Sequence, residues 1–135
     1  MRFVPPLLLA IAVASACHDP VAPDPIGTWG GTHIALIVTA SDGTVEYDCA
    51  TGTITEPVRV RSDASFDAAG TFSPGHGGPI QPGEVFPVYP ARYAGRIIGD
   101  VMTLFVTRTD TAMSIGAYSL QRGVQAQLFK CVAAG

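Results

Sequence analysis

The sequence predicts an all-β protein, built as an eight-stranded antiparallel meander barrel. Short runs rich in Thr, Val, Ile, Phe and Tyr recur through residues 26–135, and these residue types suit a pleated surface. Turn signals such as Asp42-Gly43 separate the runs. No amphipathic helical pattern occurs in the same span. A two-sheet β-sandwich is the alternative, and the succession of hairpins favours the barrel, which hides its strand edges.

The first sixteen residues predict a secretory signal peptide. Met1-Arg2 carries the positive charge, and residues 3–16 form an uncharged, mostly apolar run. That run is shorter than the roughly 20 residues that a membrane-spanning helix needs. It also contains Pro5 and Pro6, which disrupt helices. We therefore expect residues 1–16 to direct export and then to be removed.

The run ends in Ala14-Ser15-Ala16-Cys17, which resembles the lipobox of bacterial lipoproteins. The resemblance implies cleavage before Cys17 and attachment of lipid to its sulfur, so that the membrane is a partner through this anchor. Because His18 and not Asp follows the cysteine, it implies the outer membrane, facing the periplasm or the cell surface. An ordinary signal peptide, cut after Ala16 with Cys17 unlipidated, is the alternative.

A tether follows the proposed anchor. Residues 17–25 contain three prolines and few residues suited to packing. A Pro-rich segment adopts an extended conformation of about 3 Å per residue. The sequence thus predicts three parts: a signal peptide (1–16), a lipidated cysteine with its tether (17–25) and a β-barrel domain (26–135).

The two other cysteines predict a disulfide. If lipid occupies Cys17, Cys49 and Cys131 remain as an even pair in an exported, oxidising setting. We expect a Cys49–Cys131 bridge between the second strand and the last, with two buried free thiols as the alternative. Neither cysteine has a neighbour at the spacing of a zinc site, so no metal site is predicted.

Strands are expected in two groups on either side of a long loop. Asp42-Gly43 and residues 50–52 mark turns in the first group, and residues 74–90 are too dense in Gly and Pro for regular structure. Loops of this length in a compact domain are usually functional. The predicted strands are 28–40, 45–49, 53–61, 65–72, 91–98, 101–109, 114–121 and 124–132.

The segment Gly27-Thr28-Trp29, followed by an aliphatic strand, resembles the first strand of the calycins, the lipocalin and avidin barrels. The resemblance implies a barrel in which Trp29 closes one end and a late basic residue packs across its ring. Arg122 stands at the corresponding distance from the C-terminus. The likeness covers about twenty residues and implies architecture more than a ligand.

Residues 45–52, with the string Tyr47-Asp48-Cys49, resemble a strand of the periplasmic lysozyme-inhibitor lipoproteins, which are small disulfide-tied barrels. Cys131 matches their terminal half-cystine. Their inhibitory Ser-Gly-x-x-Tyr loop has no counterpart, since the nearest string, residues 91–95, lacks Ser-Gly.

Chemical motifs are scarce in this sequence. The net charge of −3 and the lack of a basic block argue against nucleic-acid binding. We find no hydrolase, zinc-protease or nucleotide-binding motif, and His18, His33 and His76 are scattered. No enzymatic activity, metal or cofactor is therefore expected. The acidic stripe of Glu46 and Asp48 is predicted to form cross-strand ion pairs with Arg59 and Arg61.

These observations lead to one functional hypothesis and an alternative. We expect a non-enzymatic, lipid-anchored binding protein of the cell envelope that holds a small apolar ligand in the barrel mouth. Its candidate contacts are Trp29, Phe86, Tyr89 and Tyr93. The alternative is an interaction, structural or inhibitor-like lipoprotein that acts on an envelope protein through the 74–90 loop.

The lipid anchor is testable. Replacing Cys17 by Ser removes the only sulfur to which lipid could be attached at this position, so incorporation of a labelled fatty acid should cease. The protein should then leave the membrane fraction. A Cys17→Ser variant that is still labelled and membrane-bound would contradict the lipoprotein hypothesis.

Overall fold

The computed structural model describes residues 2–3, 11–12 and 21–131. The predicted cleavage site and Cys17 lie outside the described residues. No helix that could cross a membrane is found in the part of the chain that the structure describes.

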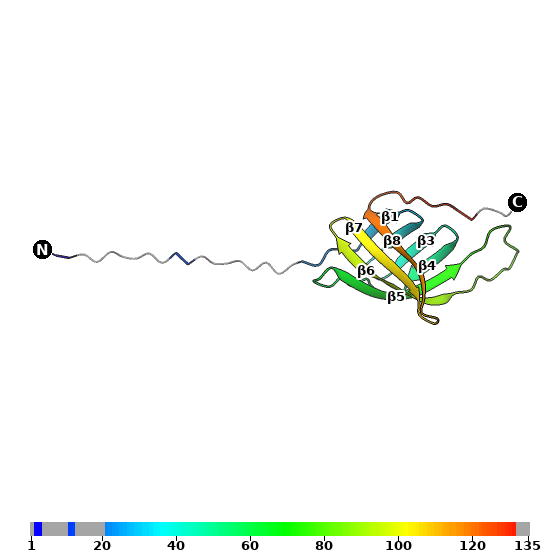
Figure 1. The fold of residues 1–135 in the computed structure, drawn as a ribbon, viewed down its shortest axis with the longest axis horizontal. Helices are drawn as coiled ribbons and strands as arrows, with labels where there is room; N and C mark the ends of the chain where they lie inside the picture. Colours follow the sequence, from blue (N-terminus) through cyan, green and yellow to red (C-terminus); the bar gives the residue numbers. More distant parts are fainter. Residues whose placement is uncertain (1, 4–10, 13–20, 132–135) are drawn as a thin grey trace.

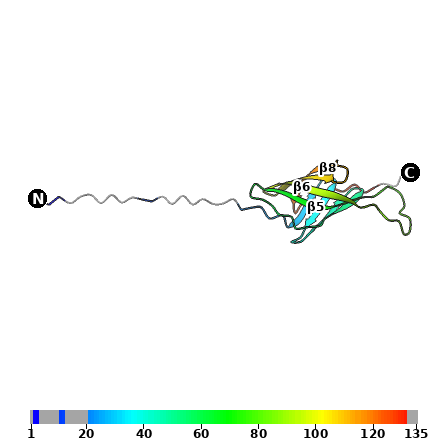
Figure 2. The same ribbon diagram turned by 90° about the horizontal axis from the view of Figure 1, so that it is seen from below.

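The described domain is a closed barrel of eight antiparallel strands, each paired with the next in sequence. The predicted all-β meander barrel is thus confirmed, and the two-sheet sandwich is excluded (Figures 1 and 2). Pairing of the first strand with the last closes the sheet. The strands are β1 (Gly27–Gly31), β2 (Ile34–Val38), β3 (Gly43–Tyr47), β4 (Ala50–Ile54), β5 (Ser65–Pro74), β6 (Tyr89–Ile98), β7 (Val101–Arg108) and β8 (Met113–Arg122).

The barrel has two distinct ends. Residues 21–26 lead into β1 at the end that also holds the 39–42 turn, the 55–64 segment and Gly99-Asp100. We call this the entry end. The opposite end, the mouth, carries the β1–β2, β3–β4 and β7–β8 turns and the 75–88 segment. Figure 1 shows this segment projecting away from the side where the chain enters.

The predicted first strand, 28–40, is in fact a hairpin. It splits into β1 and β2 at a turn of Thr32 and His33, with Gly31 paired to Ile34. His33 has a φ of 70°, in the left-handed region that such tight turns require. Because the turn contains neither Gly nor Asn, the sequence pattern predicts one continuous strand across it.

The predicted strand 53–61 is also wrong, because β4 begins earlier and ends at Ile54. Residues 50–52, predicted as a turn, are the first half of β4. After β4 ends, the Glu56 carboxylate accepts the amide N–H of Ala69 at 2.8 Å. A side chain thus pairs with β5 where a strand would use a backbone carbonyl. Val58 and Val60 pack against the core at the entry end, outside any strand.

Residues 124–132 were predicted as a strand. The described part, residues 124–131, is instead a tail that lies against the outside of β1. It forms one isolated parallel bridge, Thr32 to Gln127, because β1 already pairs with β2 and β8. Gly30 has no side chain and so allows the tail to lie close to β1. A Cβ on Gly30 would lie 2.0 Å from the carbonyl oxygen of Val124. The total of eight strands is unchanged, because the first predicted strand forms two strands and the last predicted strand forms none.

The remaining predictions agree with the structure to within two residues. Runs 65–72, 91–98, 101–109 and 114–121 correspond to β5, β6, β7 and β8. Residues 75–88 form no helix or strand, as their Gly and Pro content predicts.

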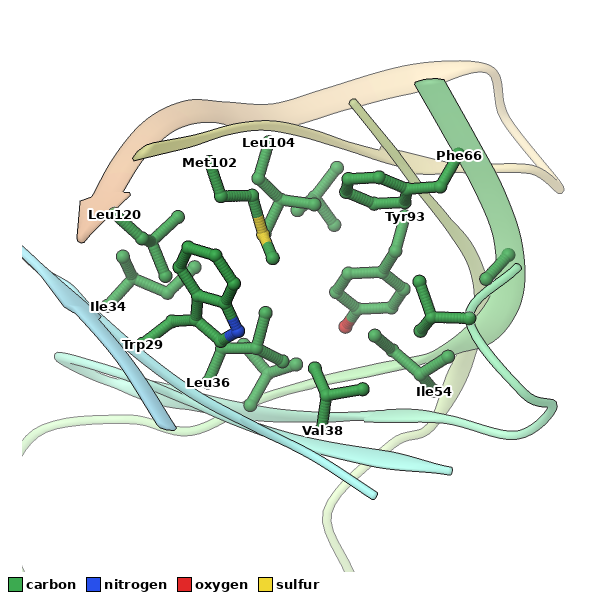
Figure 3. Packing of buried hydrophobic residues seen from close by; sticks show 14 of the residues in the cluster. Trp29, Ile34, Leu36, Val38, Ile54, Phe66, Tyr93, Met102, Leu104 and Leu120 are labelled. Carbon is green, nitrogen blue, oxygen red and sulfur yellow. The ribbon is translucent and has the colours of Figure 1, made fainter. Parts of the chain in front are cut away.

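Alternate residues of every strand point into the barrel and form one hydrophobic core (Figure 3). Met102, Leu104, Val106 and Leu120 are each at most 1% exposed. Together with Trp29, Tyr93 and Phe66 these side chains fill the interior. Two cavities lie at the mouth, and a shallow hollow of about 530 Å³ is lined by Arg61 and by residues of β5, β6 and β7.

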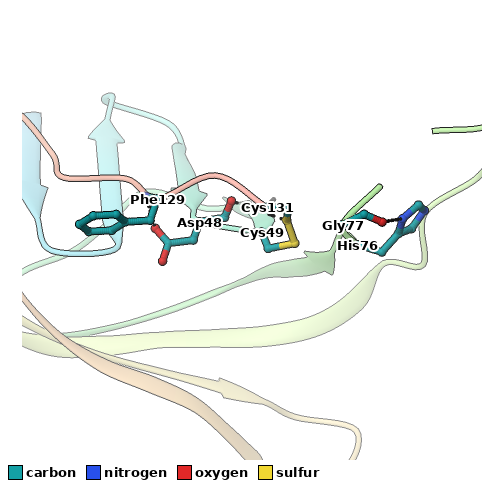
Figure 4. The surroundings of a disulfide bond; sticks show 6 residues. All are labelled: Asp48, Cys49, His76, Gly77, Phe129 and Cys131. Atoms are coloured by element: carbon teal, nitrogen blue, oxygen red, sulfur yellow. Dashed lines mark hydrogen bonds between the residues drawn. A yellow bond between two sulfur atoms is a disulfide. The ribbon is translucent and has the colours of Figure 1, made fainter. Parts of the chain in front are cut away.

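The predicted Cys49–Cys131 disulfide is confirmed, with the two Cα atoms 5.0 Å apart (Figure 4). It joins the β3–β4 turn to the tail and not, as expected, a second strand to a last one. The bridge closes an 82-residue span and holds the end of the tail at the mouth.

Removal of this bridge should destabilise the fold. The double variant Cys49→Ala/Cys131→Ala should lose roughly 4 kcal/mol of unfolding free energy, close to the chain-entropy value for a loop of this size. Urea denaturation followed by tryptophan fluorescence would measure the loss, with the reduced unmodified protein as a matched control. An unchanged midpoint for both would contradict a stabilising disulfide.

Candidate functional site

Trp29, the first predicted ligand contact, closes the entry end of the barrel. Its side chain is 1% exposed, and the Arg122 guanidinium lies 4.2 Å from the ring centroid. This contact is the one that the calycin resemblance implies. The indole Nε1–H donates to the carbonyl of Pro25 at 2.9 Å, while Arg122 donates to the carbonyls of Asp24 and Ile26. The residues just before β1 are therefore fixed to the barrel.

Tyr93, the second predicted contact, is fully buried in the core (Figure 3). Its hydroxyl donates to the carbonyl of Thr71 at 2.7 Å and accepts from Tyr47 at 3.2 Å. Burial raises the pKa of Tyr93 to about 12, so the phenol stays neutral. A Cβ on Gly52 would lie 2.1 Å from the Tyr93 hydroxyl. Neither Trp29 nor Tyr93 lines the mouth cavities described below.

Tyr89 and Phe86, the other two predicted contacts, lie at the mouth but have different surroundings. Tyr89 begins β6, and the Arg108 guanidinium stacks 3.5 Å from its ring centroid. Asp110 holds that guanidinium through two hydrogen bonds of 3.0 and 2.7 Å. Phe86 belongs to the 75–88 segment, where its ring lies 5.7 Å from that of His76. The structure therefore does not gather the four predicted residues into one site.

The larger mouth cavity lies between the 75–88 segment and the disulfide, and we call it the disulfide groove. Its volume is about 380 Å³. The apolar part of its lining consists of the disulfide, Tyr47, Ala50, Ile80 and Phe86, and the Glu46–Lys130 ion pair stands at its edge. Figure 4 shows the disulfide with His76 and Gly77 on one side of it and Phe129 and Asp48 on the other.

A histidine–carboxylate pair shapes the segment that forms one wall of the groove. His76 Nε2 lies 2.5 Å from Glu84 Oε1, and His76 Nδ1 lies 2.9 Å from the carbonyl oxygen of Gly77. These two acceptors, the Gly77 carbonyl first, raise the pKa of His76 above its usual value. The His76 contact and the amide of Gln81 lower the pKa of Glu84. The pair thus connects the two ends of a Gly- and Pro-rich loop.

The second cavity, of about 260 Å³, opens where β8 runs past the end of β1. We call it the seam cavity. Ile115 and Tyr118 line it from β8, Phe72 from β5, and His33 and Asp48 from the facing turns. The Tyr47 ring joins this lining, 5.4 Å from Phe72 and 5.8 Å from Tyr118.

Asp48 links the wall of the seam cavity to the tail. Its Oδ1 accepts the amide N–H of Phe129 at 2.8 Å, and its Oδ2 lies 2.5 Å from Nδ1 of His33. The Phe129 amide, and then the contact with His33, lower the pKa of Asp48. His33, Asp48 and Phe129 were not predicted as site residues. They lie within the predicted strands 28–40, 45–49 and 124–132, and nothing in the sequence indicates that the tail folds back onto the first two.

The predicted ion pairs of Glu46 and Asp48 with Arg59 and Arg61 are wrong. Glu46 pairs with Lys130 and Asp48 with His33. Arg61 donates to the Ser65 hydroxyl instead. The two arginines belong to the entry end, because β4 stops at Ile54 and the chain does not carry them alongside β3.

No group of three or more metal-ligating side chains is found among the described residues. Ser73, which lies close to His76 in the sequence, donates its hydroxyl hydrogen to the carbonyl of Pro87 at 2.7 Å. That contact fastens the 75–88 segment to β5. The polar groups of the mouth thus serve to hold loops in place.

The fold and the mouth define a small, disulfide-tied up-and-down β-barrel with two adjacent cavities at one end. Comparison with protein-family models, with curated proteins and with solved structures finds no match.

The His76–Glu84 pair makes the loop sensitive to pH. Because the pKa of His76 is raised, its contribution is fully present at acidic pH and is lost as the pH rises through that raised value. The contribution of Glu84 is lost as the pH falls through its lowered pKa. The 75–88 segment should therefore be held most firmly at pH values between the lowered pKa of Glu84 and the raised pKa of His76.

An NMR titration of the His76 ring would test the pair. In Glu84→Gln the pKa of His76 should fall but stay above its ordinary value, since the Gly77 carbonyl remains as a partner. Glu46→Gln, on the other side of the groove, is the matched control and should leave it unchanged. A His76 pKa that is the same in Glu84→Gln as in the unmodified protein would disprove the pairing.

Proposed function

We propose that this protein is a non-enzymatic, lipid-anchored binding protein of the cell envelope that holds a small apolar group in the disulfide groove. The proposal rests on the disulfide groove. Its volume of about 380 Å³ falls within the range of small-molecule sites, about 300–1,000 Å³. Its lining combines apolar surfaces with a few polar groups at the edge, which is also typical of such sites.

The arrangement of the two ends supports this function. In the proposal, Cys17 carries the lipid, and the chain reaches the barrel at the entry end, where Trp29 and Arg122 fix residues 24–26. The groove is at the opposite end, among the β3–β4 turn and the 75–88 segment. A protein anchored in this way presents its site away from the membrane that holds it.

A second candidate function is contact with an envelope protein through the 75–88 segment. Ile80, Val85 and Val88 on this segment are 64%, 88% and 63% exposed. Exposed apolar side chains that cluster on one loop are typical of interaction surfaces. The inhibitor-like role belongs to this candidate, since it would use the same loop.

A fluorescent apolar probe, N-phenyl-1-naphthylamine, would test the groove. The probe should bind the unmodified protein, and Phe86→Ala should weaken binding at least tenfold, because that ring forms part of the wall. Val85→Ala is the matched control, since Val85 is on the same loop and 88% exposed. Absence of binding, or equal binding by both variants, would exclude the apolar-ligand function and favour the protein-contact candidate.

A further inference from the structure

Exposed apolar side chains gather on one sector of the entry end. Five strands that follow one another around the barrel, from β6 through β7, β8 and β1 to β2, each contribute one of them at or beside the strand end that lies here. Their exposed fractions range from 41% to 69%. We call this set the apolar rim, and it consists of Ile98, Val101, Val124, Ile26 and Ile37.

Backbone contacts hold these side chains as one surface. Ile98 pairs with Val101 across the β6–β7 turn, and Val101 pairs with Gln121 of β8. The amide N–H of Val124 donates to the carbonyl of Gln121 at 3.4 Å. The rim therefore continues from β6 across β8 on ordered backbone.

The remainder of the entry end is polar. Between residues 39 and 65 no large apolar side chain of the described chain is exposed, and the exposed residues there are mainly Thr, Ser, Asp, Glu and Arg. Inside the rim, Oδ1 of Asp100 lies 3.3 Å from Nε of Arg122. The Asp24 carboxylate accepts the amide N–H of Ile26 at 2.9 Å. Apolar patches bordered by polar residues mark contact sites for proteins or membranes.

The chain enters the barrel within this rim. Arg122 holds the carbonyls of Asp24 and Ile26, so residue 24 has a fixed place beside it. From Cys17 to Asp24 a Pro-rich chain reaches no more than about 20 Å, at roughly 3 Å per residue. If lipid is attached to Cys17, the membrane surface lies within that distance of the rim.

We propose that the apolar rim rests in the surface of the membrane that holds the lipid anchor, with its side chains at the boundary between headgroups and acyl chains. This inference rests on the anchor at Cys17, which belongs to the proposed function. Side chains that enter this boundary bind more strongly the more apolar area they bury. With the rim as a second contact, the barrel stands with its mouth away from the membrane.

The position of the tether selects the membrane over a protein partner or a second copy of this chain. Any occupant of the rim has to share the space around residues 24–26 with the chain that leads to Cys17. The membrane meets this requirement, because that chain ends in it. A folded partner would have to fit between the rim and a membrane no more than about 20 Å away.

Tryptophan fluorescence of the full-length, lipidated protein in phosphatidylcholine vesicles would test the proposal. Ile98→Trp places a reporter in the rim, and Val85→Trp, at the mouth and 88% exposed, is the matched control. The unmodified protein, with Trp29 alone, gives the baseline. Bromine atoms on the lipid acyl chains quench tryptophan only at close range. In brominated vesicles the emission added by Ile98→Trp should be mostly lost, and that added by Val85→Trp should be retained.

A second set of changes shows whether the new tryptophan by itself draws the barrel onto the membrane. In Ile98→Trp combined with Ile37→Asp and Val124→Asp, two charges replace apolar side chains of the rim. The emission should then return to its value in unbrominated vesicles, while the protein still floats with them. Emission that stays quenched would overturn the rim as the contact.

The remaining outcomes separate the rim from the anchor. Vesicle-bound protein in which neither reporter or both reporters are quenched would overturn the rim and leave the anchor in place. Protein that does not float with the vesicles would overturn the anchor and this inference with it. A dimeric mass, with the Ile98→Trp reporter shielded from acrylamide but not quenched by bromine, would overturn the inference in favour of a second copy.

Discussion

The stacking of Arg122 on Trp29 is the interaction on which the rest of the barrel depends. These residues are the first of the three pairs that join β8 to β1 and so close the sheet. Arg122 also binds the carbonyls of Asp24 and Ile26, which fixes the incoming chain. Because β8 ends here, Gly123 can turn the tail back along β1, and the tail then reaches the mouth, where the disulfide holds it.

The molecule thereby divides into an apolar, packed part and a mouth held by polar contacts. The entry end and the interior are filled with apolar side chains, and the buried hydroxyls of Tyr47 and Tyr93 satisfy each other and the carbonyl of Thr71. At the mouth, the loops are held by polar contacts on the surface, such as His76 with Glu84 and His33 with Asp48. The contacts that hold the mouth loops are thus separate from those that pack the interior.

Much of the fold could be predicted from the sequence, because alternation and turn signals are local. The strands after residue 64 follow their pattern closely, and the Trp29–Arg122 contact follows from a motif. Failures occurred where a distant contact overrides the local signal. The turn at Thr32 and His33 has no turn-forming residue, and residues 124–131 have the composition of a strand but meet a sheet already closed. The cavities could not be predicted because tail and loop meet there only in three dimensions.

The opposite placement of entry and mouth has a mechanical consequence. A partner held at the mouth while the chain is held before residue 24 would pull β1 along its own axis. In an antiparallel sheet the ladder hydrogen bonds run perpendicular to the strands, so those on both sides of β1 would be strained together and would not open one after another. Five pairs with β2 and three with β8 would share that force, and the barrel would resist it as a unit.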